Sequence, residues 1–293
     1  MAVQLGPSMQ LALGTVQFGL AYGIAGSGFA VPEDEARRIL DAAWAHGIRT
    51  LDTASAYGDI ESRLARLCGS LPFRIASKVP AVPDSLTPTE AAVWVVGQAV
   101  QSRHRLGARL TALMCHRAED FLGERGAAVY PALHRWAASE GVALGASCYG
   151  PEALLQVHSQ HALAAAQLPG NALDQRLLQA LPAALPGVDI HLRSVFLQGL
   201  LLMPESAGRA RLPAAGPALQ RWHRWCRDRQ LQPLVGALSV VKSFAAASTV
   251  VVGVETTAQI EEIATAWALA APALAPLLAE NDPAVIDPRT WTS

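Results

Sequence analysis

Short apolar runs are each followed by a longer stretch in which apolar residues recur every three or four positions, along most of this chain. The short runs predict buried strands and the longer stretches predict amphipathic helices. We expect strands at residues 11–14, 48–52, 73–77, 110–114, 142–147, 163–167, 190–195 and 249–252. Helices are expected at residues 33–45, 60–67, 87–105 and 125–140, from residue 152, and at residues 174–185 and 256–270. Such alternation is typical of a parallel sheet with helical crossovers.

This order of elements predicts one α/β domain over residues 1–293. Eight strand–helix units in about 250 residues fit a (β/α)₈ TIM barrel, whose ligands bind at the carboxyl ends of the strands. A doubly wound sheet is the alternative, but the glycines after the first strand lack the GxGxxG spacing of a dinucleotide-binding sheet. Residues 203–217 are expected to form an irregular loop, and residues from about 279 to 293 a C-terminal tail over the barrel.

The composition fits a compact soluble protein. The chain has 293 residues, 51% of them hydrophobic and 16% charged, with a net charge of −1. It lacks the clustered Lys and Arg that neutralise phosphates, and the Arg-rich segment 221–227 has the spacing of a helix with one wet face, so no nucleic-acid partner is expected. Four cysteines form no CxxC pair and are expected to be reduced and buried: Cys68, Cys115, Cys148 and Cys226.

The ends of the chain and its apolar runs predict the compartment. The N-terminus has neither the basic region nor the long apolar core of a signal peptide. No apolar run approaches the roughly 20 residues that cross a bilayer. We therefore expect a cytoplasmic protein with no membrane contact.

Polar residues end three consecutive predicted strands. Asp52 follows the second strand, Lys78 the third and His116 the fourth, and Tyr57 lies in the loop behind Asp52. In a barrel all four would meet at one face. Taken singly, Asp52 could be a helix N-cap, Lys78 a surface residue and His116 a satisfied core histidine. Their occurrence together at successive strand ends favours a functional site.

The chemistry expected of these residues is proton transfer. Charged residues that end neighbouring apolar strands are costly to bury alone, so Lys78 and Asp52 are expected to pair. We predict that the nearby ammonium group lowers the pKa of Tyr57, which would make Tyr57 a proton donor near neutral pH. A neutral His116 could hydrogen-bond a substrate carbonyl oxygen and fix its orientation.

The segments that hold these residues resemble the aldo-keto reductase family. Residues 47–58, 76–79 and 114–116 look like the family's three tetrad segments, and residues 13–19 are similar to its opening strand and loop. The resemblance runs from about residue 11 to about residue 270. It implies a (β/α)₈ barrel and metal-free hydride transfer between NADP(H) and a small-molecule carbonyl or alcohol. By this resemblance Tyr57 is the acid–base residue, Lys78 and Asp52 tune it, and His116 places the carbonyl.

The resemblance also implies where a cofactor binds. Ser147 and Gln167 would hold the nicotinamide carboxamide, with Cys148 where the family often has asparagine. Arg193 stands where many relatives stack an aromatic residue on the nicotinamide, and a planar guanidinium can also lie against a ring. Segments 167–176 and 193–201 resemble a bacterial subgroup often found near polysaccharide-biosynthesis genes. The other cofactor contacts implied here are Gly14, Thr15, Ser194, Leu197 and Gly199.

The adenosine end of the cofactor is expected near the last strand. Segment 252–262 matches the family's last strand and helix start, where a helix N-terminus suits an anion. The residues implied are Gly253, Glu255, Thr256, Thr257, Gln259 and Glu262. No Lys or Arg lies in this segment, and Glu255 would repel a 2′-phosphate. NADP(H) follows from the resemblance, and NAD(H) or dual use stays open.

The substrate is expected in an apolar-walled pocket. Phe18 and Tyr22 would line it together with Tyr57 and His116. Two other functions stay open: a non-catalytic nicotinamide-binding barrel that senses redox state for a partner protein, and a metal-dependent hydrolase that uses His116 with Asp52. Metal sites usually need more ligands than this pair provides, so no metal is expected. No pattern in the sequence indicates an oligomeric state.

Overall fold

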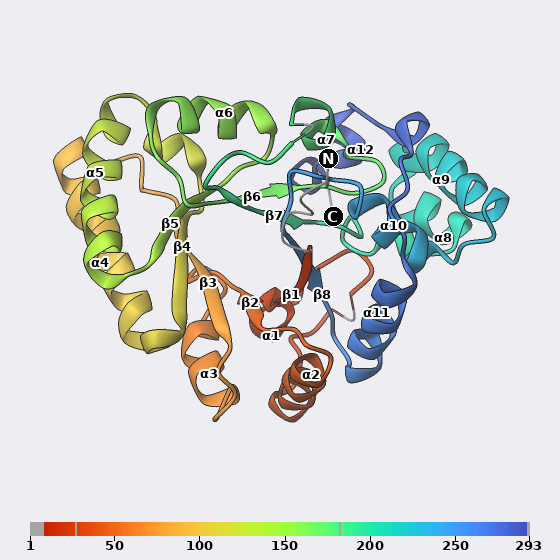
Figure 1. Ribbon diagram of the computed structural model, residues 1–293, viewed down its shortest axis with the longest axis horizontal. Helices are drawn as coiled ribbons and strands as arrows, with labels where there is room; N and C mark the ends of the chain where they lie inside the picture. Colours follow the sequence, from red (N-terminus) through yellow and green to blue (C-terminus); the bar gives the residue numbers. More distant parts are fainter. Residues whose placement is uncertain (1–8, 27, 182, 292–293) are drawn as a thin grey trace, which may run out of the picture.

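Eight strands form a closed parallel barrel in the order β1 to β8 in the computed structural model, which describes residues 9–26, 28–181 and 183–291 (Figure 1). The predicted (β/α)₈ barrel is confirmed. β1 closes the barrel against β8, with Gln10 opposite Thr249 and Gly14 opposite Gly253. The strands are β1 (Gln10–Gly14), β2 (Thr50–Asp52), β3 (Arg74–Val79), β4 (Leu110–Cys115), β5 (Ala143–Ser147), β6 (Ala165–Pro169), β7 (Asp189–Arg193) and β8 (Thr249–Gly253).

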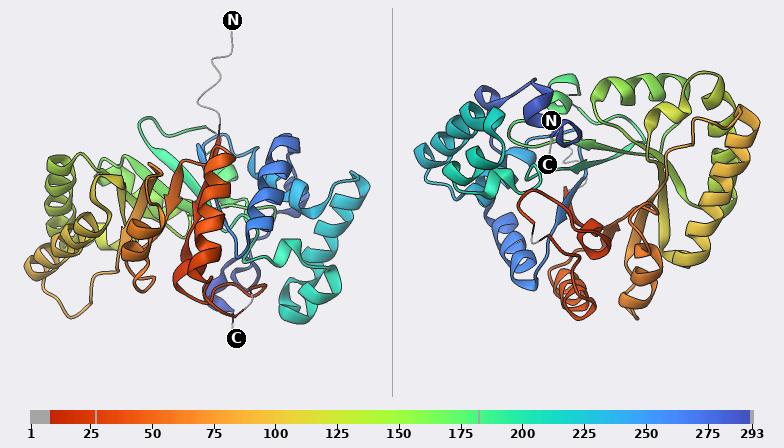
Figure 2. Two further views of the ribbon diagram at one scale, coloured as in Figure 1. Left: turned by 90° about the horizontal axis from the view of Figure 1, so that it is seen from below. Right: turned by 180° about the vertical axis from the view of Figure 1, so that it is seen from behind.

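Helices lie outside the strands, as the views in Figure 1 and Figure 2 show. Among the described residues, no helix is long and apolar enough to cross a membrane. The four cysteines are buried and unpaired, as predicted. The helices are α1 (Val16–Gly19), α2 (Glu33–Ala45), α3 (Ile60–Leu67), α4 (Pro88–Leu106), α5 (Gly123–Glu140), α6 (Pro151–Gln160), α7 (Arg176–Ala180), α8 (Glu205–Arg211), α9 (Gly216–Asp228), α10 (Pro233–Val241), α11 (Thr257–Leu269) and α12 (Pro283–Ile286).

Local sequence sets the ends of the long helix α4. Thr87 accepts from the backbone N–H of Glu90 while the Glu90 carboxylate accepts from the backbone of Thr87, which is a capping box. Pro88 occupies the first turn, where its missing N–H costs nothing. At the other end Gly107 has φ +57°, a conformation that glycine adopts without strain, and the chain turns toward β4.

Two predicted elements are wrong. The helix expected at residues 174–185 is only Arg176–Ala180, because Leu181 precedes a proline in the sequence and leaves the helical region. The irregular loop expected at residues 203–217 instead contains α8 and the start of α9. Gly208 allows these two helices to pack closely, since a Cβ there would lie 2.9 Å from Leu219 Cδ1.

The C-terminal residues return to the side of the barrel formed by β5 and β6. The backbone N–H of Glu280 donates to Leu173 O at 2.8 Å, after β6. Beyond α12, the guanidinium of Arg289 lies 3.4 Å above the ring of Tyr149, which follows β5. Arg289 of the tail therefore lies beside the carboxyl end of β5.

Candidate active site

A buried ion pair lies at the carboxyl ends of β2 and β3. Lys78 Nζ is 2.8 Å from Asp52 Oδ1 and 2.9 Å from Oδ2, and it also donates to Thr53 O at 3.0 Å. Lys78 is 2% exposed and Asp52 is 7% exposed. From β6, Gln167 Nε2 donates to Asp52 Oδ1 at 2.6 Å. The expected Lys78–Asp52 pair is thus present, and Gln167 adds a hydrogen bond to its carboxylate.

The loop that carries Tyr57 is tied to the end of β3. Both the backbone N–H and the hydroxyl of Ser55 donate to Lys78 O, at 3.1 and 2.9 Å. On the other side Gly19 comes so close that a Cβ would lie 2.3 Å from Tyr57 O. The loop is therefore held from two sides, which fixes the backbone of Tyr57.

The electrostatics of Tyr57 differ from the sequence-based expectation. Burial raises the pKa of Tyr57 well above its ordinary value, and the Asp52 carboxylate raises it further, while Arg193 acts to lower it. The prediction that Lys78 lowers this pKa is wrong, because both Asp52 oxygens already balance the ammonium charge. Tyr57 is consequently a protonated phenol at neutral pH.

His116 stands opposite Tyr57 at the end of β4. Their ring centroids are 6.2 Å apart and the rings are nearly perpendicular, at 82°. Burial lowers the pKa of His116 to about 4, and the charges of Lys78 and Arg193 contribute in the same direction. The imidazole is therefore neutral at physiological pH, as the sequence predicted.

A cavity of about 410 Å³ extends from Tyr57 to the start of α11. Gln167 and Tyr22 line the end near Tyr57, and Glu262 lines the other end. Of the residues expected in catalysis or in cofactor or substrate binding, the cavity wall includes Gly14, Thr15, Tyr22, Asp52, Tyr57, Gln167, Arg193, Ser194, Gly199, Gly253, Glu255, Gln259 and Glu262. The structure thus brings most of the expected cofactor contacts to one surface.

The wall of this cavity carries features that suit a nicotinamide dinucleotide. Gln167 Oε1 and Gln17 Oε1 are buried without a hydrogen-bond partner in the described part of the chain, and both residues line the cavity. A carboxamide N–H₂ is the kind of donor that such an oxygen lacks. After β7, Ser194 and Gln198 hold positive φ angles of 59° and 53°, a strained backbone that is common at ligand sites.

The backbone donors at the start of α11 already have protein acceptors. Thr256 Oγ1 accepts from the N–H of Gln259 at 3.3 Å, and Gln259 Oε1 accepts from the N–H of Glu255 at 2.7 Å. The carboxylate of Glu35, from α2, accepts from both the N–H and the hydroxyl of Thr257 at 2.6 and 2.9 Å. A carboxylate therefore occupies the place where a helix N-terminus would otherwise attract an anion.

Some expected contacts lie elsewhere. Phe18 is 0% exposed in the core, so its assignment to the substrate pocket is wrong. Leu197 is also fully buried and its N–H donates to Ser194 O, so that N–H does not face the cavity. In the described part of the chain, the remaining residues outside the cavity wall are Lys78, His116, Ser147, Thr256 and Thr257.

Three residues near the site were not among the candidates predicted from the sequence. Gln17 packs against Gly253, where a Cβ would lie 2.5 Å from Gln17 Nε2. Glu35 looks in the sequence like an ordinary acid in the first turn of a helix, and only its contact with Thr257 reveals its position. Tyr149 follows the β5 strand, so its place two residues after a strand end was the one available signal.

The fold and the site together define a (β/α)₈ barrel enzyme with a buried Lys–Asp pair, a tyrosine and a neutral histidine at the strand ends. The chain matches the model of the Aldo/keto reductase family over residues 10–273. It therefore belongs to this family of NAD(P)H-dependent oxidoreductases. Among the described residues, no cluster of three or more His, Cys, Asp or Glu is placed to hold a metal ion.

Solved structures of similar fold come from several bacteria. The protein PA4992 of Pseudomonas aeruginosa is 21% identical, with a TM-score of 0.65 and coverage of 91% of this chain and 92% of that one. The aldo-keto reductase AKR11C1 of Bacillus halodurans is 19% identical, with a TM-score of 0.66 and coverage of 91% and 88%. The glycerol dehydrogenase AKR11B4 of Gluconobacter oxydans is 18% identical, with a TM-score of 0.64 and coverage of 90% and 88%. No protein with a curated description matches the chain.

Proposed function

We propose that this protein reduces a small aldehyde or ketone, or oxidises the corresponding alcohol, with Tyr57 as the general acid or base. The observation that carries this proposal is the buried Lys78–Asp52 pair beside Tyr57, at one end of a long cavity. A phenol and a neutral imidazole that face each other at 6.2 Å can both reach a carbonyl oxygen between them. Bound NAD(P)H would supply a hydride to the carbonyl carbon.

The protein groups would act on the substrate oxygen. Tyr57 O–H donates the proton in the reductive direction, and the neutral imidazole of His116 donates a hydrogen bond that orients the carbonyl. Lys78 is held by both Asp52 oxygens, so its ammonium group has a fixed position at the carboxyl ends of β2 and β3. Because this pair is already formed in the protein, its two charges keep fixed positions during the reaction.

Replacement of Tyr57 tests the proposal. Tyr57→Phe keeps the ring and removes the proton, so kcat should fall by about 10²- to 10⁴-fold, while the Kd for NAD(P)H changes by less than about twofold. Carbonyl turnover is followed by NAD(P)H absorbance and binding by tryptophan quenching. Tyr130→Phe is the matched control, because the hydroxyl of Tyr130, on α5, donates to Ala162 O in the loop after α6, and Tyr130 lies outside the cavity wall.

Two results would count against this assignment. Turnover retained by Tyr57→Phe would exclude Tyr57 as the proton donor. Cofactor binding by the wild-type protein, with no turnover across a broad panel of carbonyls and alcohols, would instead support a non-catalytic nicotinamide-binding role.

We also propose that NAD(H) is the preferred cofactor. Arg193 is the one Lys or Arg among the described cavity-lining residues, and it lies at the Tyr57 end. The far end presents Glu255 and Glu262, and the Glu35 carboxylate already bonds to Thr257. A 2′-phosphate there would meet these carboxylates, and Arg38, the cation beside Glu35, is already paired with it at 2.6 Å, which disfavours NADP(H).

Separate titrations of NADH and NADPH test this preference. We expect NADH to bind at least about 10-fold more tightly than NADPH. Glu255→Gln should reduce the ratio of the two Kd values by about 3- to 10-fold, because one charge that repels the 2′-phosphate is removed. Glu33→Gln is the control, since Glu33 lies on α2 near Glu35 but makes only long contacts with Arg37 and Arg66, both at 3.9 Å. Equal or tighter binding of NADPH by the wild-type protein would overturn the preference.

A further inference from the structure

Arg193 brings a positive charge into the part of the cavity that holds Tyr57. It ends β7, and its side chain lines the cavity. Its charge acts to lower the pKa values of Tyr57, Tyr22 and His116, so the guanidinium lies within electrostatic reach of all three rings. Any substrate whose carbonyl reaches Tyr57 therefore lies close to this cation.

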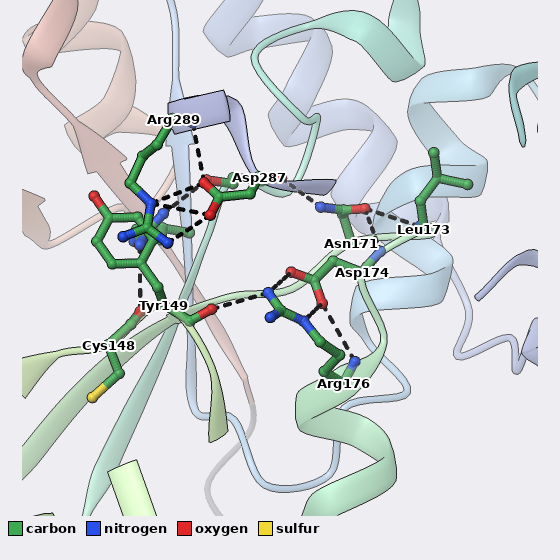
Figure 3. Close-up of polar contacts among 10 residues, drawn as sticks. Cys148, Tyr149, Asn171, Leu173, Asp174, Arg176, Asp287 and Arg289 are labelled. Carbon is green, nitrogen blue, oxygen red and sulfur yellow. Dashed lines mark hydrogen bonds and ion pairs between the residues drawn. The ribbon is translucent and has the colours of Figure 1, made fainter. Parts of the chain in front are cut away.

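Among the described residues, the other cations near this end of the cavity are already paired. Lys78 is bound by Asp52 at 2.8 Å. Figure 3 shows the remaining two: Arg289 above the ring of Tyr149 and bonded to Asp287, and Arg176 bonded to Asp174. Each of these pairs is neutral as a unit.

Arg193 has no such partner in the described part of the chain. A guanidinium has five N–H donors. Two of those on Arg193 bond weakly to neutral acceptors, Ser194 Oγ at 3.2 Å and Cys148 O at 3.3 Å. Its Cζ also lies 4.5 Å from the ring centroid of Tyr149, on which Arg289 stacks as well. A half-buried cation with free donors and no counter-charge is costly unless an anion binds to it.

We propose that Arg193 is a specificity-determining residue that binds an anionic group, a carboxylate or a phosphate, on the carbonyl substrate. This inference rests on the proposed reductase function, and it adds the class of substrate. The planar fork of Arg193 can accept two anion oxygens side by side, with the stacked Tyr149 ring holding its orientation. The anion-bearing end of the substrate would then be fixed while its carbonyl lies between Tyr57 and His116.

The competing role for Arg193 is a contact with the cofactor, through its diphosphate or its nicotinamide ring. The two roles differ in what the loss of the guanidinium changes. A cofactor contact would weaken NAD(P)H binding and affect every substrate equally. A substrate contact would raise KM for anionic substrates alone.

The test compares carbonyl compounds that differ mainly in charge. Succinic semialdehyde and butanal have the same number of carbons, and only the former bears a carboxylate; glyceraldehyde 3-phosphate and glyceraldehyde form the phosphate pair. We expect the wild-type protein to favour one anionic member by about 10- to 100-fold in kcat/KM, the size of effect of a charged hydrogen bond. Whichever pair shows the preference identifies carboxylate or phosphate as the anion. The preference should shrink at high salt.

Variants then assign the preference to Arg193. Arg193→Met should raise KM for the anionic substrate by about 10- to 100-fold more than it raises KM for the neutral one, a difference that loss of a cofactor contact alone would not produce. Arg193→Lys should retain part of the preference for the anionic substrate, because lysine keeps the positive charge but lacks the planar guanidinium that donates two parallel hydrogen bonds. The control is the double variant Asp287→Asn with Arg289→Gln, which removes a neutral pair beside Tyr149 and should keep the preference.

Binding of non-reacting anions provides a readout that needs no turnover. Titration calorimetry with succinate and with inorganic phosphate, each added to the protein saturated with cofactor, should show binding that Arg193→Met abolishes. If no carbonyl is reduced but the anion binds through Arg193, the reductase proposal fails and the anion site stands. The anion site is overturned by equal kcat/KM for the charged and neutral pairs, or by an Arg193→Met variant that loses cofactor affinity instead.

Discussion

At the scale of single residues, the site depends on which charges are balanced. Asp52 accepts from both Lys78 and Gln167, although Gln167 lies 115 residues further along the chain. At His116, burial lowers the pKa to about 4; the charges of Lys78 and Arg193 act in the same direction, and Asp52 opposes them. The residue is a neutral hydrogen-bonding group in the native state, and a cation below pH 6.5 in the unfolded state.

The lowered pKa of His116 predicts how stability changes with pH. Between pH 6.5 and about 4 the unfolded chain binds a proton at His116 that the native protein does not, so native stability falls as pH decreases. From pH 7.5 to pH 4.5 the wild-type protein should lose about 2–3 kcal/mol more free energy of unfolding than His116→Gln. Urea unfolding at several pH values measures this, and the other histidines cancel in the comparison. Parallel pH curves for the two proteins would contradict it.

At the scale of elements, a buried carboxylate joins α3, β3 and α4. Glu61 is 2% exposed, and it accepts from Ser77 Oγ at 2.6 Å and from Ser102 Oγ at 3.2 Å. Arg105 completes the group with an ion pair at 2.9 Å. The sequence predicted helix α3 with correct bounds, yet gave no sign that Glu61 faces inward, since its partners lie on other elements.

Removal of the Glu61 charge should destabilise these three elements together. Glu61→Gln leaves the Arg105 cation without its counter-charge, and we expect the free energy of unfolding to fall by about 2–3 kcal/mol. Glu261→Gln, an exposed acid on α11, should change it by less than about 0.5 kcal/mol. The two proteins are compared by chemical denaturation. If Arg105→Met combined with Glu61→Gln costs as much as the two single changes added together, the residues are not coupled and the explanation is wrong.

At the scale of the whole molecule, the closed barrel places residues from distant parts of the chain at one mouth. Parallel pairing sets Gly14 opposite both Asp52 and Gly253, so the carboxyl ends of β1, β2 and β8 lie side by side. Helices α8, α9 and α10 lie between β7 and β8 and form a lobe beside the barrel (Figure 1). Arg289 of the C-terminal segment stacks on Tyr149 at the same end of the barrel. Closure of the barrel and the C-terminal segment therefore both contribute residues near the site.

The sequence by itself determined the order of elements and the four polar residues at the strand ends. Both follow from local patterns, because apolar periodicity sets each element and parallel strands must direct their carboxyl ends to one face. The tertiary structure alone decided that burial raises the pKa of Tyr57, that Glu35 bonds to Thr257, and that Arg193 has no carboxylate partner in the described part of the chain. These properties depend on desolvation and on distances between side chains far apart in sequence, which no local pattern contains.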